Sequence, residues 1–303
     1  MPRVPVRAHL ALGYRMKTLV LDKSAVKAAP RGLLKSLRTK FDFLLSDTLL
    51  HEIATEKLDQ RSSFSEIERA DLDRKIRANF LRTIEEAGNL WIDNEAALLW
   101  EIEQGCSAKH APRISLRVTP SIDMLSEAEK QFCLDDDARK GELASVVHAR
   151  EDQQGFQEIR SWGEKKVFCQ LREDYSSERV HNQVARDAKR GFAEIALQRG
   201  LKVSPDFTPG PDWFSFGITL ASQAYLPWKF WKHGDGLADR RKPPNPYFDM
   251  VYVGYVAVAD GILSTDKDLL KLAWACWPEK TGDIYELDMK SHRIGVFKPR
   301  WSS

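Results

Sequence analysis

Acidic residues follow two predicted strands of this 303-residue chain, at the point where each strand ends. Asp22 comes directly after the apolar run at residues 18–21, and Asp266 and Asp268 follow the apolar run at residues 262–264. In open α/β sheets ligands collect beyond the carboxyl ends of parallel strands, so we expect these carboxylates to share one site. Converging carboxylates repel each other unless a cation compensates their charge. The chemistry that this pattern indicates is therefore cation binding.

Two further acids are predicted to lie on helices. Asp249 opens the apolar helix predicted over residues 250–259, and Glu52 lies about one turn into the helix predicted over residues 48–54. Each has an ordinary structural interpretation, because Asp is a favoured N-cap residue and a helix glutamate is usually solvated. A functional role for both is favoured only by their position in the chain relative to the acids at the strand ends.

The elements that must position these acids alternate between strand and helix on both sides of a long central region, and this alternation predicts a parallel α/β sheet. Short apolar runs predict the strands, and longer segments between them predict the helices. Strands are predicted at residues 18–21, 41–45, 90–92, 262–264 and 283–287. Helices are predicted at residues 48–54, 64–87, 94–104, 250–259 and 269–277.

The alternation lapses in the central region, where long segments carry charges of both signs. Helices are predicted there at residues 135–150, 152–172, 176–199 and 213–232. The predicted organisation is a basic N-terminal extension at 1–15, a core at 16–104 and 238–288, a mainly helical insertion at 105–237, and a basic tail at 289–303.

A cluster of basic and aromatic residues lies shortly before Asp249. Its basic members are Lys229, Lys232, Arg240, Arg241 and Lys242, and its aromatic members are Trp228, Phe230 and Trp231. Lys and Arg neutralise phosphates and exposed rings stack on bases, so the cluster is a candidate nucleic-acid-binding surface. Such aromatic residues are more often part of a core, and that alternative stays open.

Composition excludes some classes of protein. Lys plus Arg is 46 and Asp plus Glu is 44, a net charge of +2, which excludes a broadly basic nucleic-acid coat. The four cysteines are widely spaced without a CxxC pair, which argues against a disulfide framework or a zinc site and fits a reducing cytoplasm. No apolar run approaches the length of a membrane span, so we expect a cytoplasmic protein without a membrane partner.

In their order along the chain, the acidic motifs resemble those of the PIN-like nuclease family. The resemblance covers roughly residues 16–104 and 238–288 and does not account for the region between them. The motifs that carry it are Asp22 at a strand end, Ser46 followed by the helix residue Glu52, Asp249 at a helix start, and Ser264, Asp266 and Asp268 in one loop.

This resemblance implies a Rossmann-like parallel sheet and a metal-dependent phosphodiesterase that acts on RNA more often than on DNA. The implied catalytic and metal-binding quartet is Asp22, Glu52, Asp249 and Asp266, with Asp268 as an accessory metal ligand and Ser46 and Ser264 as supporting hydroxyls. The implied cofactor is Mg²⁺ or Mn²⁺, which prefer hard oxygen ligands and can activate a water for attack on phosphorus. A homo-oligomer and a regulatory protein partner stay open.

Three other classes of protein compete with a nuclease as interpretations of the sequence. A PIN-like scaffold or nucleic-acid-binding protein without activity, which would use the helical insertion for partner contacts, stays open. A nucleotide-binding enzyme is disfavoured, because no Gly-rich phosphate loop follows the first strand. A zinc protease is excluded, because His51 and Glu52 are followed by Thr55 where the HExxH motif needs its second histidine.

Overall fold

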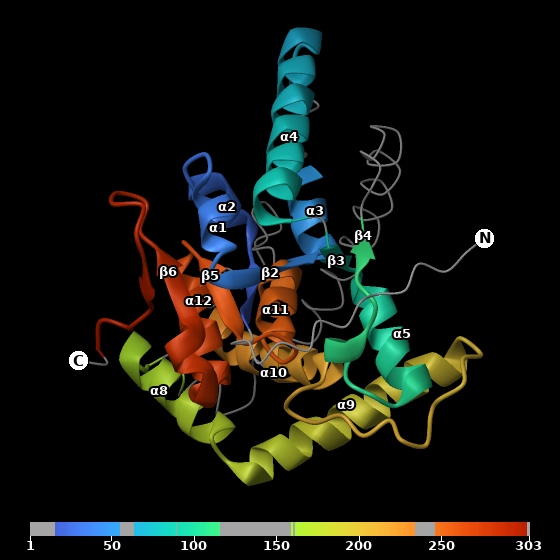
Figure 1. The fold of residues 1–303 in the computed structure, drawn as a ribbon. Helices are drawn as coiled ribbons and strands as arrows, with labels where there is room; N and C mark the ends of the chain where they lie inside the picture. Colours follow the sequence, from blue (N-terminus) through green and yellow to red (C-terminus); the bar gives the residue numbers. More distant parts are fainter. Residues whose placement is uncertain are drawn as a thin grey trace, which may run out of the picture.

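The computed structural model shows an α/β structure built on one mostly parallel sheet (Figure 1). The structure describes residues 16–54, 64–88, 90–115, 159, 161–233 and 246–301. Within these ranges the sheet has the strand order β4-β3-β2-β1-β5-β6-β7. The strands are β1 (Lys17–Leu21), β2 (Phe41–Ser46), β3 (Leu90–Ile92), β4 (Ile114–Ser115), β5 (Gly261–Ser264), β6 (Ile284–Leu287) and β7 (Ile294–Val296).

The sheet confirms the predicted α/β class. β1 pairs in parallel with β2 and β5, and the parallel pairing continues from β2 to β3 and from β5 to β6. The chain thus extends the sheet from β1 in one direction and later from β5 in the other, an arrangement compatible with a Rossmann-like fold. The five predicted strands correspond to β1, β2, β3, β5 and β6.

The central strands form because their side chains are apolar on both faces. Leu19, Val20 and Leu21 of β1 are completely buried, as are Ile262 and Leu263 of β5. A parallel strand covered by helices on both faces needs this continuous apolar sequence rather than an alternating one. The same property made these strands recognisable in the sequence.

Two edge strands were not predicted. β4 and β7 each pair antiparallel with the neighbouring strand, β3 and β6 respectively. β4 has only two residues, and it lies in the region that we expected to be mainly helical. β7 is largely exposed and belongs to the segment that was predicted as a basic tail. Short edge strands with little apolar surface carry no clear sequence signal, because backbone pairing with an existing sheet suffices to form them.

The helices of the described residues form two groups (Figure 1). The first comprises α1 (Lys23–Ala28), α2 (Leu33–Leu37), α3 (Asp47–Ala54) and α4 (Glu66–Ala87). The second comprises α8 (Glu164–Tyr175), α9 (Glu178–Gln198), α10 (Phe214–His233), α11 (Pro246–Tyr255) and α12 (Lys267–Cys276). Figure 1 shows α5 (Asn94–Gln104) beside the β3 and β4 edge. The short 3-10 helices are η2 (Ala108–His110) and η4 (Pro278–Asp283).

None of the helices within the described ranges is long and apolar enough to cross a membrane. The predicted N-terminal extension and the helix predicted at residues 135–150 lie outside those ranges. Of the helices predicted at residues 152–172 and 176–199, the structure describes α8 and α9. α8 packs against α12, and both α9 and α8 contact α10, so these helices share one packed body with the sheet's own helices.

The interpretation of Asp249 as an N-cap is wrong. α11 begins at Pro246, so Asp249 lies inside the first turn rather than ahead of it. Proline is favoured at the first position of a helix because that position needs no intrahelical N–H donor and has the φ angle that proline already adopts. The helix also ends at Tyr255, four residues before the predicted end at Ala259. Asp249 therefore lies within the first turn of α11 and not at its N-cap position.

Glu101 joins α5 to the start of α10 through the protein interior. Its side chain is completely buried, and Oε1 accepts the backbone N–H groups of Ala108, at 2.9 Å, and Phe214, at 2.6 Å. Oε2 accepts the N–H of Ser215 at 2.8 Å. Phe214 and Ser215 open α10, so the carboxylate satisfies N–H groups that the helix itself leaves without partners.

α10 and α11 cross at two glycines. A Cβ atom at Gly217 would lie 2.2 Å from the backbone oxygen of Gly254, and a Cβ atom at Gly254 would lie 2.9 Å from a side-chain carbon of Ile218. A methyl group at Gly217 would require the backbone to move, and one at Gly254 would require at least the side chain of Ile218 to move. This close approach determines how far α11 lies from α10 and therefore where the side chains of α11 reach.

We predict that Gly217→Ala lowers the free energy of unfolding by about 1–3 kcal/mol, because the added methyl group forces the two helices apart. The matched control is Gly191→Ala in α9, where an added Cβ meets nothing within 4 Å. That control should gain about 0.5–1 kcal/mol from the better helix propensity of alanine. Urea denaturation followed by circular dichroism measures both. Equal effects of the two substitutions would show that the crossing is not tight.

Candidate functional site

The candidate site lies where β1 and β5 run side by side in the centre of the sheet. Val20 pairs with Ile262 and Leu21 with Leu263, so both strands end at the same level. After β1 the chain moves toward β2, and after β5 it moves toward β6. This divergence makes the carboxyl ends of β1 and β5 the topological switch point of the sheet, the place where open α/β sheets bind ligands.

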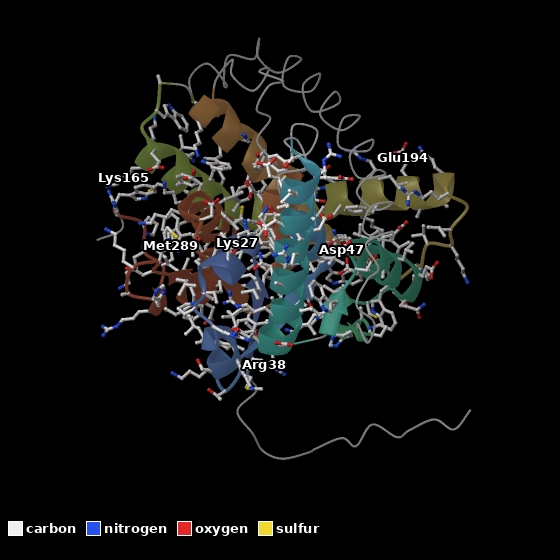
Figure 2. The ribbon with its side chains drawn as sticks, turned by 90° about the horizontal axis from the view of Figure 1, so that it is seen from above. Lys27, Arg38, Asp47, Lys165, Glu194 and Met289 are labelled. Carbon is white, nitrogen blue, oxygen red and sulfur yellow. The ribbon has the colours of Figure 1, made fainter. Side chains whose placement is uncertain are left out.

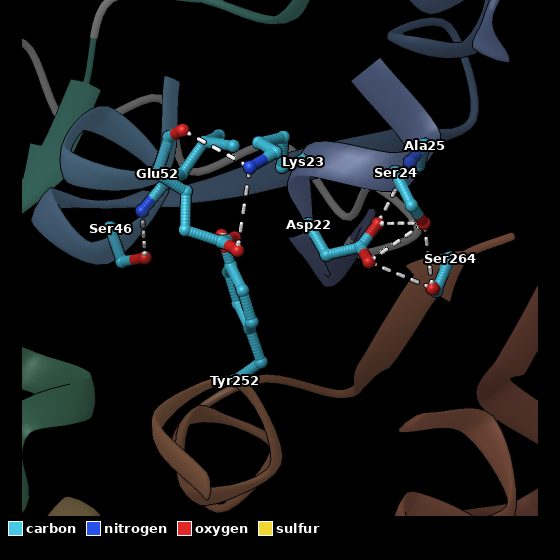
Figure 3. A network of polar contacts seen from close by, with 9 residues as sticks. Asp22, Lys23, Ser24, Ala25, Ser46, Glu52, Tyr252 and Ser264 are labelled. Carbon is cyan, nitrogen blue, oxygen red and sulfur yellow. Dashed lines mark hydrogen bonds and ion pairs between the residues drawn. The ribbon is translucent and has the colours of Figure 1, made fainter. Parts of the chain in front are cut away.

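Asp22 lies at the end of β1 with only 4% of its surface exposed. Its carboxylate caps α1 by accepting the N–H of Ala25 at 2.9 Å. It also accepts hydrogen bonds from the hydroxyls of Ser24, at 2.8 Å, and Ser264, at 2.9 Å (Figure 3). Burial raises the pKa of Asp22 to about 7, the nearby charge of Glu52 adds to the increase, and the hydrogen bonds oppose it.

Ser264 connects the two strand ends. Its hydroxyl donates to Asp22 and accepts the backbone N–H of Asp266 at 2.8 Å. The hydroxyl oxygen of Ser24 lies 3.1 Å from that of Ser264 and accepts the N–H of Thr265 at 3.0 Å. The two hydroxyls therefore hold the loop after β5 against the carboxylate that follows β1.

Glu52 approaches Asp22 from α3, close enough for its charge to act on that carboxyl group. Its carboxylate accepts a hydrogen bond of 2.6 Å from the hydroxyl of Tyr252, and the ammonium of Lys23 lies 3.8 Å from the other carboxylate oxygen (Figure 3). Burial raises the pKa of Glu52, and the charge of Asp266 acts in the same direction, whereas Lys23 and Tyr252 oppose the increase. The ordinary interpretation of Glu52, a helix glutamate exposed to solvent, is therefore wrong.

Asp266 and Asp268 occupy different surroundings although they are two residues apart. Asp266 is exposed and caps α12 by accepting the N–H groups of Asp268, at 2.8 Å, and Leu269, at 3.2 Å. Asp268 forms ion pairs with Lys232 and Lys271. Burial raises the pKa of Asp268, but these two ammonium groups outweigh burial and hold it below its usual value. Asp268 is therefore neutralised by lysines.

Asp249 is half-buried in the first turn of α11, three residues before Tyr252 on the same helix. Burial raises the pKa of the Tyr225 hydroxyl on α10, and the charge of Asp249 adds to that increase. The charge of Asp249 thus acts on Tyr225, whereas the charge of Glu52 acts on Asp22 and that of Asp266 acts on Glu52.

The remaining predicted site residues have varied positions. Ser46 is completely buried, and its hydroxyl accepts the N–H of Leu49 at 3.3 Å, which starts α3. Lys232 contacts Asp268 and lies 5.4 Å from the ring centroid of Trp228. Trp228 is 1% exposed, so it belongs to the core and is not a base-stacking platform. Predicted binding residues outside the described part of the chain are Arg240, Arg241 and Lys242, and the side chain of Lys229 is not described either.

Sequence reasoning missed three residues that contact Asp22 or Glu52, namely Lys23, Ser24 and Tyr252. Lys23 and Ser24 follow Asp22 directly, so their adjacency to a strand-end acid was an available signal. The sequence signal for Tyr252 was weaker: a residue three positions after Asp249 lies on the same face of a helix. Its contact with Glu52 joins residues that are 200 positions apart.

A second acidic pair was also missed, at the ends of β2 and β3. Burial raises the pKa of Asp47 to about 7, and the charge of Asp93 adds to the increase. Asp93 caps α5 by accepting the N–H of Ala96 at 2.7 Å. Helix capping explains the position of Asp93, and we assign this pair no part in the candidate site.

The residues fit a metal ion in chemistry but do not surround one in the present arrangement. Asp22, Glu52 and Asp266 offer the hard oxygen donors that Mg²⁺ and Mn²⁺ prefer. Within the described ranges, however, no three His, Cys, Asp or Glu residues are grouped closely enough to hold an ion. The oxygens of Asp22 accept hydrogen bonds from serines, and those of Glu52 contact Lys23 and Tyr252. Ligation would require these contacts to rearrange.

We predict that unfolding becomes easier between about pH 4 and pH 7 because Asp22 ionises there only in the unfolded chain. A carboxyl group with a raised pKa favours the protonated native state, so its stabilisation is present at low pH and is lost as the pH rises. The shift corresponds to at most about 4 kcal/mol. Asp22→Asn should reduce this pH dependence, measured by urea denaturation in EDTA at pH 5 and pH 8. An unchanged difference between the two pH values would contradict the prediction.

Comparison with known proteins does not place the chain in a family. No family model, no curated protein and no solved structure matches it. The role of the site must therefore be inferred from its own residues and geometry.

Proposed function

We propose that this chain is a PIN-like, metal-dependent phosphodiesterase, an endoribonuclease that cleaves single-stranded or structured RNA. The observation that carries the proposal is the meeting of Asp22, Glu52 and Asp266 near the carboxyl ends of β1 and β5. These acids come from three separate segments of the chain, and the charge of Glu52 acts on Asp22 while that of Asp266 acts on Glu52. The burial of Asp22 and the partial burial of Glu52 beside other acids are costly for folding, which favours a functional reason for their presence.

A divalent cation would compensate this cluster of like charges. The residues that would hold Mg²⁺ or Mn²⁺ are Asp22, Glu52 and Asp266, with Asp249 as the fourth acid and Asp268 as an accessory ligand. Burial raises the pKa values of Asp22 and Glu52, which means that their ionised forms are incompletely compensated without a cation. When bound, such an ion activates water and stabilises the charge that develops on phosphate oxygens.

The protein's own residues orient the acids. Ser24 and Ser264 donate to Asp22, so the carboxylate keeps one direction relative to the ends of β1 and β5. Tyr252 does the same for Glu52. Lys23 and Lys27 lie on α1, and their positive charges act on Glu52, which places cations beside the acids where the phosphates of a substrate would approach.

A second candidate is a PIN-like nucleic-acid-binding or scaffold protein without activity. It is favoured by the contact of Lys23 with Glu52, since a lysine already compensates one of the acids. Such a protein would bind RNA without cleaving it and would not require a divalent ion.

We predict that Asp22→Asn and Asp249→Asn each reduce RNA cleavage by at least about 100-fold in the presence of Mn²⁺, because each removes a charge from the proposed cation site. Asparagine preserves the shape of the side chain, so the melting temperature should stay the same or rise. Cleavage of a fluorescently labelled RNA, with Mn²⁺ or with EDTA, measures the effect.

The control is Glu194→Gln, which removes one charge from an exposed position on α9, in a different part of the molecule from Lys27 of α1 (Figure 2). It should cleave RNA at the wild-type rate. RNA binding without any cleavage by the wild-type protein would favour the scaffold, and cleavage that persists in EDTA would exclude the proposed chemistry.

We predict a separate effect for the basic residues before α11. Replacing Arg240 and Arg241 with alanine should weaken RNA binding and reduce the slope of log affinity against log salt by about 1.4, since each phosphate contact contributes about 0.7 on single strands. The control pair is Lys165→Ala with Lys189→Ala, which removes the same charge from exposed positions on α8 and α9. A filter-binding assay across salt concentrations distinguishes them. Equal slopes for the two double variants would refute a specific binding surface.

A further inference from the structure

Glu52 is contacted on both carboxylate oxygens by residues from two different elements. The hydroxyl of Tyr252, on α11, donates to Oε2 at 2.6 Å, and the ammonium of Lys23, on α1, lies 3.8 Å from Oε1 (Figure 3). Lys23 also donates to the backbone oxygen of Glu52 at 3.2 Å. The side chain of Glu52 is 16% exposed and that of Lys23 is 27% exposed, so both contacts are shielded in part from water.

The two contacts differ in their effect on a cation. A hydroxyl that donates to a carboxylate fixes the direction of the carboxylate and adds no net charge, and it leaves lone pairs for a metal ion. An ammonium group adds a positive charge at the position where a metal ion would need the negative charge of the carboxylate. The first contact prepares a ligand, whereas the second competes with the ion.

We propose that Tyr252 and Lys23 are positioning residues that set the affinity of the site for a divalent cation in opposite directions. The inference rests on the proposed function, and it identifies how that site is regulated by its own surroundings. Tyr252 holds Glu52 near the ends of β1 and β5, and Lys23 compensates the acids when no cation is bound and must leave Glu52 for the cation to bind.

The next turn of α11 supplies a matched control for Tyr252. The hydroxyl of Tyr255 donates to the side-chain oxygen of Asn94, also at 2.6 Å, and both tyrosines are at most 2% exposed. Replacing either tyrosine with phenylalanine removes one hydroxyl from a buried hydrogen bond of the same length. Only Tyr252 contacts an acid of the site, so an effect on cation binding in that variant alone cannot come from the general loss of a buried hydrogen bond.

Lys27 supplies the control for Lys23. It lies one turn further along α1, it is exposed, and its charge also acts on Glu52, though less than that of Lys23. Lys27→Met therefore changes the net charge near the site by the same amount as Lys23→Met. It leaves the contact of Lys23 with Glu52 intact.

The experiment is calorimetric titration of the full chain with Mn²⁺ at pH 7.5, with no RNA present. Tyr252→Phe should weaken Mn²⁺ binding by about 10-fold, the usual effect of removing a residue that orients a metal ligand. Lys23→Met should strengthen it by at least about 5-fold, because a competing unit charge within about 4 Å is removed. The Mn²⁺ affinities of Tyr255→Phe and Lys27→Met should stay within about twofold of the wild-type affinity, because neither substitution removes a direct contact with Glu52.

Each outcome decides the matter. Equal weakening by Tyr252→Phe and Tyr255→Phe would show that the tyrosine is merely structural, and unchanged or weaker binding in Lys23→Met would show that the lysine does not compete. Either result overturns the inference and leaves the proposed function standing, provided that Asp22→Asn abolishes the binding of Mn²⁺. Absence of any Asp22-dependent binding in the wild type would overturn both.

Discussion

The close crossing of α10 and α11 determines where one side of the candidate site can lie. Gly217 and Gly254 allow backbone to approach backbone there, and no larger residue would fit without moving a helix. At this separation α11 presents Tyr252 to Glu52 and Tyr255 to Asn94, each through a hydrogen bond of 2.6 Å. A displacement of α11 would break these two hydrogen bonds. The packing of the two glycines therefore determines the geometry of polar contacts elsewhere on α11.

The buried acids of this structure have two kinds of surroundings. Glu101 accepts three backbone N–H groups and contacts no other acid among its hydrogen-bond partners, which is how a structural carboxylate is stabilised. Asp22 also accepts from three groups, but Asp22 and Glu52 lie near other acids, so like charge adds to the effect of burial in raising their pKa values. This difference separates acids that hold the fold together from acids whose arrangement favours a cation, and it is the physical basis of the proposed function.

The central strands and most helices were predictable because their signals are local. A continuous apolar run is enough to indicate a strand that is buried on both faces, as in β1 and β5, and Gly88 marks the end of α4 in sequence and structure alike. The start of α11 was misplaced because Pro246, a favoured first residue of a helix, was not taken into account. β4 and β7 could not be found in this way, since an edge strand of two or three residues depends on the sheet that it joins.

The sequence by itself determined the class of the fold, the position of Asp22 after a strand and the presence of several acids in a suggestive order. Tertiary structure alone decided that Ser264 donates to Asp22, that Tyr252 and Lys23 contact Glu52, and that Asp268 pairs with lysines while the charge of Asp249 acts on Tyr225. Strand and helix formation depends on side chains within a few residues and on their burial. Which acid meets which partner depends on packing between segments up to 242 positions apart, and short-range sequence patterns do not encode those distances.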